Sequence, residues 1–329
     1  MKIGVARSLV LGTALSAALA LAQEQPLAPE PLPDPLSLEQ ALGLAEGHPR
    51  LAASPEARAQ FPRRHSVYLD CHQLAFSSAA PDPERDRPME TLMAASTAQR
   101  LEILARFLDV LLADLAFSRY DEAMAVAYIQ YDRASVRREL GQFSDLAVLE
   151  LESTYQEILH ERAASQIAQQ LSRSLLAQAL GRPEELPRAL IKPELPTAPD
   201  PLPEAQALLE EALAQNGEIR RQLGDAQDPD RQLISLELGQ QFRELLMRLR
   251  ALAAAQRQVQ TESAYRDLKL DQSRTLYEQE VTADLGYAMS QQTMTRMRER
   301  RVAYCRALAW AEIQVLTGKP IWAEGDTTQ

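Results

Sequence analysis

The residues of this chain best suited to metal chemistry gather in one short segment. His65, Asp70, Cys71 and His72 bring three ligand types together within residues 65–76. That segment is a candidate β-strand, and on a strand Asp70 and His72 would share one face while His65 and Cys71 would share the other. The four side chains cannot converge without a turn. We therefore expect a surface or half-buried segment. A soluble metal-handling bundle is kept as a third interpretation of the chain, after the two that its long helices suggest below.

The chain has two cysteines, Cys71 and Cys305, too few for a disulfide framework or a thiolate metal cage. An oxidising compartment permits a disulfide between them, but their spacing in sequence says nothing about their distance in space. Cys305 falls in an apolar heptad pattern, where cysteine behaves as a small apolar side chain. Whether the two cysteines pair is left open.

No arrangement typical of an enzyme is present. The sequence has no Gly-x-Ser-x-Gly, no phosphate-binding loop, no dinucleotide-binding glycine pattern and no convergent acid pair. His48 precedes Pro49 at a helix end and His160 lies among charges, so neither resembles a general base. We predict a protein that is not an enzyme and holds no metal or cofactor. A net charge of −11 disfavours nucleic acid as a partner.

The first residues predict export. Lys2 and Arg7 precede an uncharged apolar run, and Ala20-Leu21-Ala22 has the pattern of a cleavage site, so residues 1–22 are predicted to be a signal peptide cleaved after Ala22. The apolar run, about 14 residues long, is short for a membrane anchor. Residues 23–35 carry a proline at almost every second position, which predicts an extended tether.

Four long stretches avoid the 20 prolines of the chain, and these must position any functional residue. They span residues 97–142, 143–180, 230–280 and 281–317, enough for helical rods of roughly 50 to 75 Å. Apolar residues step by three and four in the first rod at Leu101, Leu104, Leu108, Leu111 and Leu115, and in the third at Leu238, Phe242, Leu245, Leu249 and Leu252. Such seams predict supercoiled helix pairs, although a plain four-helix bundle satisfies the same pattern.

The two halves of the chain repeat the same order of features. Three pairs of positions match, namely His48 with Asn216, Asp145 with Asp284, and Gly181 with Gly318. The offset falls from 168 positions at the first match to 139 and 137 at the others, so the second half lacks 29 residues before its first rod. Matches in the same order predict a duplicated structural unit.

We therefore predict an all-α fold of two tandem repeats, each a long antiparallel coiled-coil hairpin with short flanking helices, and little or no β-structure. The first repeat spans residues 36–183, with its long hairpin at 97–180. The second spans residues 204–320, with its hairpin at 230–317. A proline-rich linker, 184–203, joins the repeats, and residues 321–329 form a tail.

These features together resemble the TolC family of outer-membrane efflux proteins. The resemblance rests on the Leu-Ser-Leu-Glu-Gln-Ala-Leu opening at residues 36–42, the turn Leu-Gly-Gln-Phe-Ser-Asp-Leu at 140–146 and the closing Gly-x-Pro at Gly181 and Gly318. It implies a homotrimer in the periplasm and outer membrane, whose helices form a tunnel. It also implies that the hairpin tips dock a periplasmic adaptor (membrane fusion) protein linked to an inner-membrane pump.

The chain departs from the family where barrel strands belong. Only residues 224–229 separate the helices of the second repeat, whereas a membrane hairpin needs two spans of roughly 9 to 11 residues. In the first repeat, residues 65–76 supply one candidate strand, and Pro81, Pro83 and Pro88 interrupt the space for another. We therefore expect a shortened relative without a self-made barrel, and the alternative function is a non-conducting periplasmic scaffold.

The resemblance places partner binding at the two hairpin tips. The candidate residues are Gly141, Gln142, Phe143, Ser144, Asp145 and Leu146 in the first tip, and Thr282, Ala283, Asp284 and Leu285 in the second. Gly141 suits a left-handed turn and Ser144 suits the start of a helix. The alternative is that these residues only turn the chain and cap the helices. In a trimer, Asp145 and Asp284 would also ring the narrow end of the tunnel.

Overall fold

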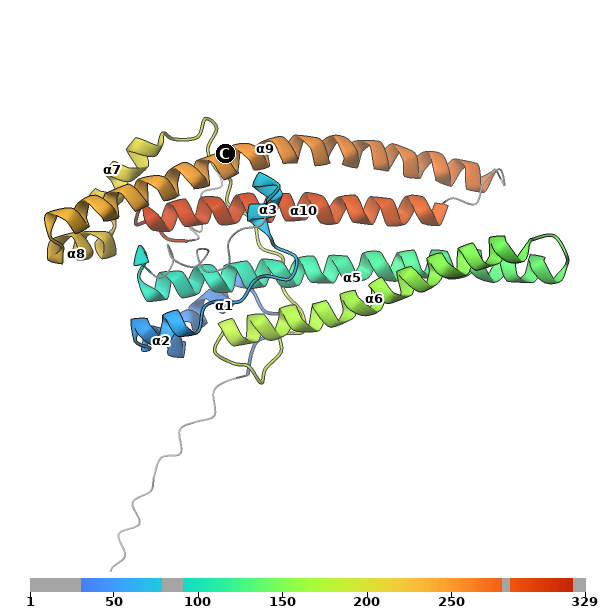
Figure 1. The fold of residues 1–329 in the computed structure, drawn as a ribbon, viewed down its shortest axis with the longest axis horizontal. Helices are drawn as coiled ribbons and strands as arrows, with labels where there is room; N and C mark the ends of the chain where they lie inside the picture. The colour runs from blue at the N-terminus through green and yellow to red at the C-terminus, as the bar shows by residue number, and fades with distance from the viewer. Residues whose placement is uncertain (1–30, 79–90, 280–284, 322–329) are drawn as a thin grey trace, which may run out of the picture. The chain divides into compact units, whose positions relative to one another are not determined.

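The computed structural model describes residues 31–78, 91–279 and 285–321, and the fold is that of the unit that begins at Leu32. These residues form helices and no strand, so the predicted all-α fold is confirmed (Figure 1). The predicted signal peptide and most of the predicted tether lie outside the described residues. The α-helices are α1 (Leu38–Gly43), α2 (Pro55–Gln60), α3 (Cys71–Phe76), α5 (Ala95–Glu139), α6 (Asp145–Ala179), α7 (Ala205–Gln215), α8 (Gly217–Asp225), α9 (Asp228–Glu278) and α10 (Leu285–Leu316).

The four long helices occupy the four proline-free stretches, with ends shifted by a few residues. Helix α9 admits a proline only in its first turn, where the missing amide proton costs nothing. Short polar side chains begin other elements: Ser37 forms a capping box on α1, and Ser144 caps α6. The positions of the rods therefore follow from prolines and capping residues that can be recognised in the sequence.

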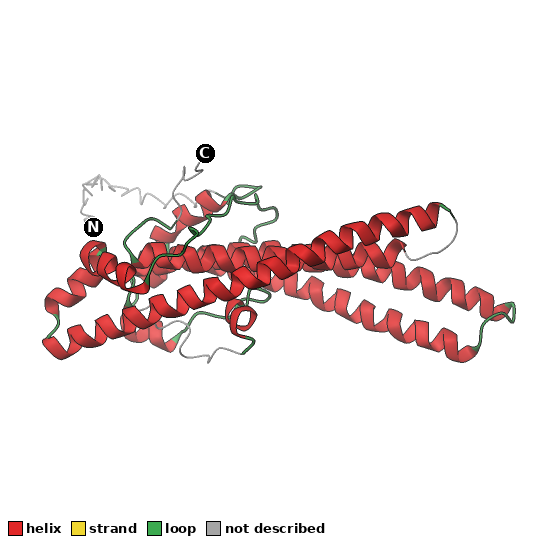
Figure 2. Ribbon diagram, turned by 90° about the horizontal axis from the view of Figure 1, so that it is seen from above, coloured by secondary structure: helices red, strands yellow, loops and turns green. Residues whose placement is uncertain are grey.

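The rods pack as two hairpins joined along one seam. Helix α5 packs against α6, α9 packs against α10, and α10 also packs against α5. Helices α6 and α9 are therefore the outer rods, as Figure 1 shows, and Figure 2 shows the same long helices from above. The predicted tandem hairpins are confirmed, while the limits of the two repeats remain a prediction.

The core lies toward the base of the hairpins. The seam residues of α9 predicted from the heptad pattern are all buried, as are Leu101, Leu104 and Leu108 of α5. Helix α5 also buries Phe107 and Leu112 on other faces, because α1, α6 and α10 surround it. Farther from the base fewer side chains are buried, among them Ala134 and Val148 near the first tip, although Thr293 of α10 still donates to Glu122 of α5 (2.7 Å).

The candidate strand at residues 65–76 does not form. Asp70 accepts a hydrogen bond from the amide of Gln73 (3.0 Å) and starts helix α3 instead. Ahead of it, buried Asp109 of α5 accepts from the amides of Val67 (2.8 Å), Tyr68 (2.8 Å) and Leu69 (2.9 Å). A carboxylate that takes three consecutive amides replaces the ladder partners that a strand would need. This connector is therefore held against α5.

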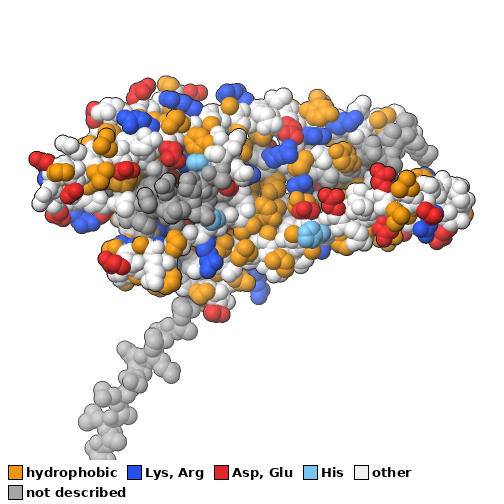
Figure 3. Space-filling model, viewed as in Figure 1, with side chains coloured by type: hydrophobic (Ala, Val, Ile, Leu, Met, Phe, Trp, Pro, Cys, Tyr) orange, Lys and Arg blue, Asp and Glu red, His pale blue; other side chains and the backbone are white. Residues whose placement is uncertain are grey.

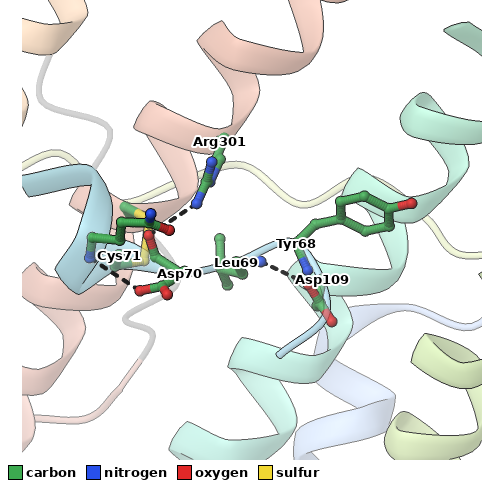
Figure 4. The surroundings of a disulfide bond; sticks show 8 residues. Tyr68, Leu69, Asp70, Cys71, Asp109 and Arg301 are labelled. Carbon is green, nitrogen blue, oxygen red and sulfur yellow. Dashed lines mark hydrogen bonds between the residues drawn. A yellow bond between two sulfur atoms is a disulfide. The ribbon is translucent and has the colours of Figure 1, made fainter. Parts of the chain in front are cut away.

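The two cysteines, whose pairing the sequence leaves open, form a disulfide that joins α3 to α10. The Cα atoms of Cys71 and Cys305 are 5.3 Å apart. Beside the disulfide, Arg301 of α10 donates to the carbonyl oxygen of Asp70 (3.2 Å), as Figure 4 shows. The connector of the first repeat is thus bonded to the last rod of the second.

The two proline-rich segments meet on the surface of the described unit. Leu36 forms an isolated parallel bridge with Leu190, in which its amide donates to Ala189 and its carbonyl accepts from Ile191 (2.9 Å each). At the end of the predicted tether, the amide of Leu32 donates to the carboxylate of Glu185 (2.9 Å) and the carboxylate of Asp34 accepts from the amide of Ala189 (3.3 Å), which fixes this end to the linker between the repeats. Separately, none of the described helices combines the length and the hydrophobicity needed to cross a bilayer.

Candidate partner-binding site

The first hairpin tip turns as its residue types predict. Gly141 has a φ of 72°, a left-handed conformation that a side chain would strain. Its amide donates to the carbonyl of Arg138 (2.8 Å), and the amide of Gln142 donates to that of Arg137 (2.9 Å), which closes the end of α5. Two residues later, the Ser144 hydroxyl accepts from the amide of Ala147 (3.2 Å) and begins α6.

Large apolar side chains surround this turn in water. We define the tip patch as Val136, Leu140, Phe143, Leu146 and Leu149, of which Leu140 is 67% and Leu146 is 77% exposed. Figure 3 shows that hydrophobic side chains also interrupt the charged surface along the rods. Clustered exposed apolar groups typically mark a surface that another molecule covers.

Sequence reasoning found part of this patch. It named Phe143 and Leu146 inside the turn but missed Val136, Leu140 and Leu149 on the flanking helices. The available signal was the four-residue step from Val136 to Leu140 at the end of α5, which puts both on one helix face. Asp145 lies in the first turn of α6, where its carboxylate favours the positive end of the helix dipole.

The second tip lies largely outside the described residues. This holds for Thr282, Ala283 and Asp284, whereas Leu285 is the first residue of α10 and is partly exposed. The ring of Asp145 and Asp284 at the tunnel end remains a prediction.

The bases of the two repeats carry a matched pair of polar contacts. In the first, the amide of Arg50 donates to Nδ1 of His48 (3.1 Å), so the neutral ring carries its proton on Nε2, which donates to the carbonyl of Gln178 (3.1 Å). In the second, the amides of Glu218 and Ile219 donate to Oδ1 of Asn216, whose Nδ2 donates to the carbonyls of Val315 and Leu316.

His48 therefore caps the short 3-10 helix Pro49–Leu51 and Asn216 caps α8, and each residue also binds the end of the last rod of its own repeat. His48 and Asn216 differ by 168 positions, the offset of the first match in the sequence. Gln178 and Val315 differ by 137 positions, the offset of the last match. The repeat is thus visible in individual hydrogen bonds.

The metal-like segment does not assemble. Within residues 31–78, 91–279 and 285–321, no group of three or more His, Cys, Asp or Glu side chains is placed to hold an ion. Cys71 is in the disulfide, and Nδ1 of His72 lies 4.0 Å from a carboxylate oxygen of Glu244. The third interpretation therefore gains no support from the described residues.

No protein-family model matches the sequence, and no curated protein matches it. Among solved structures, the chain is similar to CusC, described in connection with its folding and transmembrane channel formation, at 16% identity and a TM-score of 0.54 over 85% of this chain and 96% of that one. It is also similar to the outer membrane protein VceC of Vibrio cholerae, at 12% identity and a TM-score of 0.47 over 87% and 97%. For the open MtrE outer membrane channel of Neisseria gonorrhoeae, identity is 12% and the TM-score 0.40 over 89% and 91%. By its likeness to CusC, the chain has the TolC-like fold that its repeats and turns resemble in sequence.

Proposed function

We propose that this protein is an exported TolC-like component of a cell-envelope efflux or export system. Three copies would associate through their rods into a periplasmic tunnel or collar, and the hairpin tips would dock a periplasmic adaptor that connects to an inner-membrane pump. The observation that carries the proposal is the tip patch at the end of a hairpin with this fold. No catalytic step is assigned to the chain.

The chemistry of the tip supports docking. Leu140 and Leu146 lie on either side of a turn that is rigidly hydrogen-bonded, so their exposure follows from the backbone. Covering a large apolar side chain is worth about 1.5–3 kcal/mol, and a few such anchors can dominate an interface. A helical hairpin of an adaptor offers complementary apolar residues along one face.

The outer rods support association of copies. Helix α6 exposes Ile167 (64%) and Leu171 (50%) one turn apart, and α9 exposes Leu233 (57%), Met247 (46%) and Leu268 (72%) at multiples of seven residues. Because α6 and α9 lie on opposite sides of the described unit, α9 of one copy can pack on α6 of the next. Such a heterologous contact closes into a ring when the rotation permits it.

The docking proposal is tested with Leu146→Glu in the native host, by resistance or secretion after deletion of the chromosomal copy. Leu146 is highly exposed, so the charge should leave folding intact while it abolishes docking. The matched control is Leu186→Glu in the linker, where the leucine is 51% exposed. Full complementation by Leu146→Glu, with normal protein level, would refute docking at this tip.

The ring is tested by the mass of the mature protein in buffer and in detergent. A trimer that Ile167→Glu converts to monomer supports the assembly. A monomer in both media, together with full release by alkaline carbonate, favours the periplasmic scaffold instead. Tip variants that remain trimeric but do not restore resistance or secretion would distinguish a loss of docking from a loss of assembly.

A further inference from the structure

A cavity of about 450 Å³ opens beside the base of the first hairpin. Its wall comes from the residues between α2 and α3 and from the facing ends of α5 and α6, and it includes His48 and Gln178, which bond to each other at this base. This size lies within the range of small-molecule sites. The segment 58–64 that closes it falls within the residues that the second repeat lacks.

The wall is strongly cationic. Among the described residues that line it are four arginines, namely Arg50, Arg63, Arg64 and Arg106, and one carboxylate, Glu102. The protein as a whole carries −11, so this concentration of positive charge runs against the composition of the chain. A concave site lined by one sign of charge focuses the field on counter-ions.

Two of these guanidinium groups are buried beside the same carboxylate. The side chains of Arg63 and Arg106 are 5% and 3% exposed, and both lie against Glu102, at 3.8 Å and 2.6 Å. The next carboxylate along α5 is Asp109, two turns on, which is occupied by three backbone amides. With more guanidinium groups than carboxylates, the wall offers positive charge that an anion would neutralise.

The remaining arginines set the shape and the opening. Arg50 donates to the carbonyls of Phe61 (2.7 Å) and Arg58 (3.2 Å), and Arg106 donates to the carbonyl of Arg64 and to Ser66, so the loop is braced from both sides. The side chain of Arg64 has neither an ion-pair nor a hydrogen-bond partner among the described residues. It is the accessible guanidinium at the wall.

We propose that this cavity binds a small anion with two or more phosphate or carboxylate groups. The planar guanidinium group of arginine binds either a phosphate or a carboxylate through two parallel hydrogen bonds, which a lysine cannot supply. Arg64 makes the exposed contact, while Arg63 and Arg106 supply the field behind it. The site belongs to the first repeat and is independent of the tip and of the proposed transport role.

The imidazole of His48 is a built-in reporter of occupancy. Its burial, with the nearby positive charges of Arg50 and Arg63, lowers the pKa of His48, while Glu102 and the Gln178 carbonyl act in the opposite direction. An anion in the cavity offsets the arginine charges and should raise this pKa. A molecule that binds elsewhere on the surface leaves it unchanged.

The test is calorimetric titration of the mature, full-length protein with inorganic pyrophosphate at constant ionic strength, with sodium chloride as the reference. We expect saturable binding at one site, weakened at least tenfold by Arg64→Gln and unchanged by Arg220→Gln, which removes an exposed arginine of α8. The pKa of His48, followed by NMR, should rise with pyrophosphate in the wild type. A soluble short-chain phosphatidic acid, compared with pyrophosphate, distinguishes a lipid headgroup from a free anion as the source.

Two results would overturn the proposal. One is the absence of saturable binding by the wild type. The other is equal weakening by Arg64→Gln and Arg220→Gln with no change in the His48 pKa, which would mean that pyrophosphate responds only to net charge.

Discussion

The two repeats make the same contacts at the base and differ in the segment that leads to the first rod. In each, a polar residue caps a short helix and binds the carbonyl end of the last rod, and a glycine with positive φ, Gly181 or Gly318, follows that rod. In both, the two amides that close the rod bond at the same relative positions. Local geometry has therefore been kept while the residue in the key position changed from histidine to asparagine.

The repeats differ in what connects the short helix to the first rod. The second passes from α8 to α9 in two residues, whereas the first inserts α2, a loop and α3. That insertion packs its helix α3 against α9, and it is held to α5 by Asp109 and Arg106 and to α10 by the disulfide. The second hairpin forms without a long connector, so the extra residues of the first serve another purpose, for which the cationic cavity is our candidate.

The buried carboxylate gives the largest expected effect. Asp109→Ala leaves three amides without their acceptor, at about 1–3 kcal/mol for each buried group, so we expect the free energy of unfolding to fall by about 3 kcal/mol or more. Denaturant titration measures it. The control on the same helix is Asp121→Ala, which removes a side chain that is 49% exposed beside Arg162 and should cost at most about 1 kcal/mol. Equal losses would mean that the connector is not held by Asp109.

The disulfide should come next. Replacing both Cys71 and Cys305 by alanine removes a link that closes a loop of more than two hundred residues, and such links contribute about 2–4 kcal/mol. A reductant should lower the denaturation midpoint of the wild type to about that of the double variant. It should leave the midpoint of the double variant unchanged. A wild type insensitive to reductant would contradict the bond between the repeats.

The smallest and most specific effect that we expect is a pH dependence of stability that His48 contributes and Asn216 does not. Burial lowers the pKa of His48 below 6.5, its value in the unfolded chain, so the unfolded state binds the proton more readily. The stabilisation is complete above pH 6.5 and declines as the pH falls from there through the lowered folded-state value. Protonation of Nδ1 removes the acceptor for the amide of Arg50.

The measurement is the unfolding free energy between about pH 7.5 and 4.5 for the wild type and for His48→Asn, which copies the second repeat. The difference between the two curves isolates His48 from the other titrating groups. We expect the variant to lose less stability on acidification, by about 1 kcal/mol, the usual worth of a helix cap. Parallel curves would show that His48 is not a pH-sensitive contact.

The rods and their ends follow from local signals. Prolines bound them, heptads give the buried seam of α9, and Gly141 with Ser144 places the first turn. The tip patch was only partly predicted, because exposure of Leu140 and Leu149 depends on which faces of α5 and α6 meet. The candidate strand at residues 65–76 failed because alternation in a short segment does not distinguish a strand from an irregular segment that ends in one helical turn.

The sequence by itself determined the all-α class, the duplicated hairpins and the positions where each rod begins and ends, since helices, caps and turns depend on residues a few positions apart. Only the tertiary structure decided that Asp109 holds residues 67–69, that Cys71 meets Cys305 and that four arginines line one cavity. Those contacts join positions about 40 to more than 200 residues apart. No local preference encodes them, because they form only after the rods have packed.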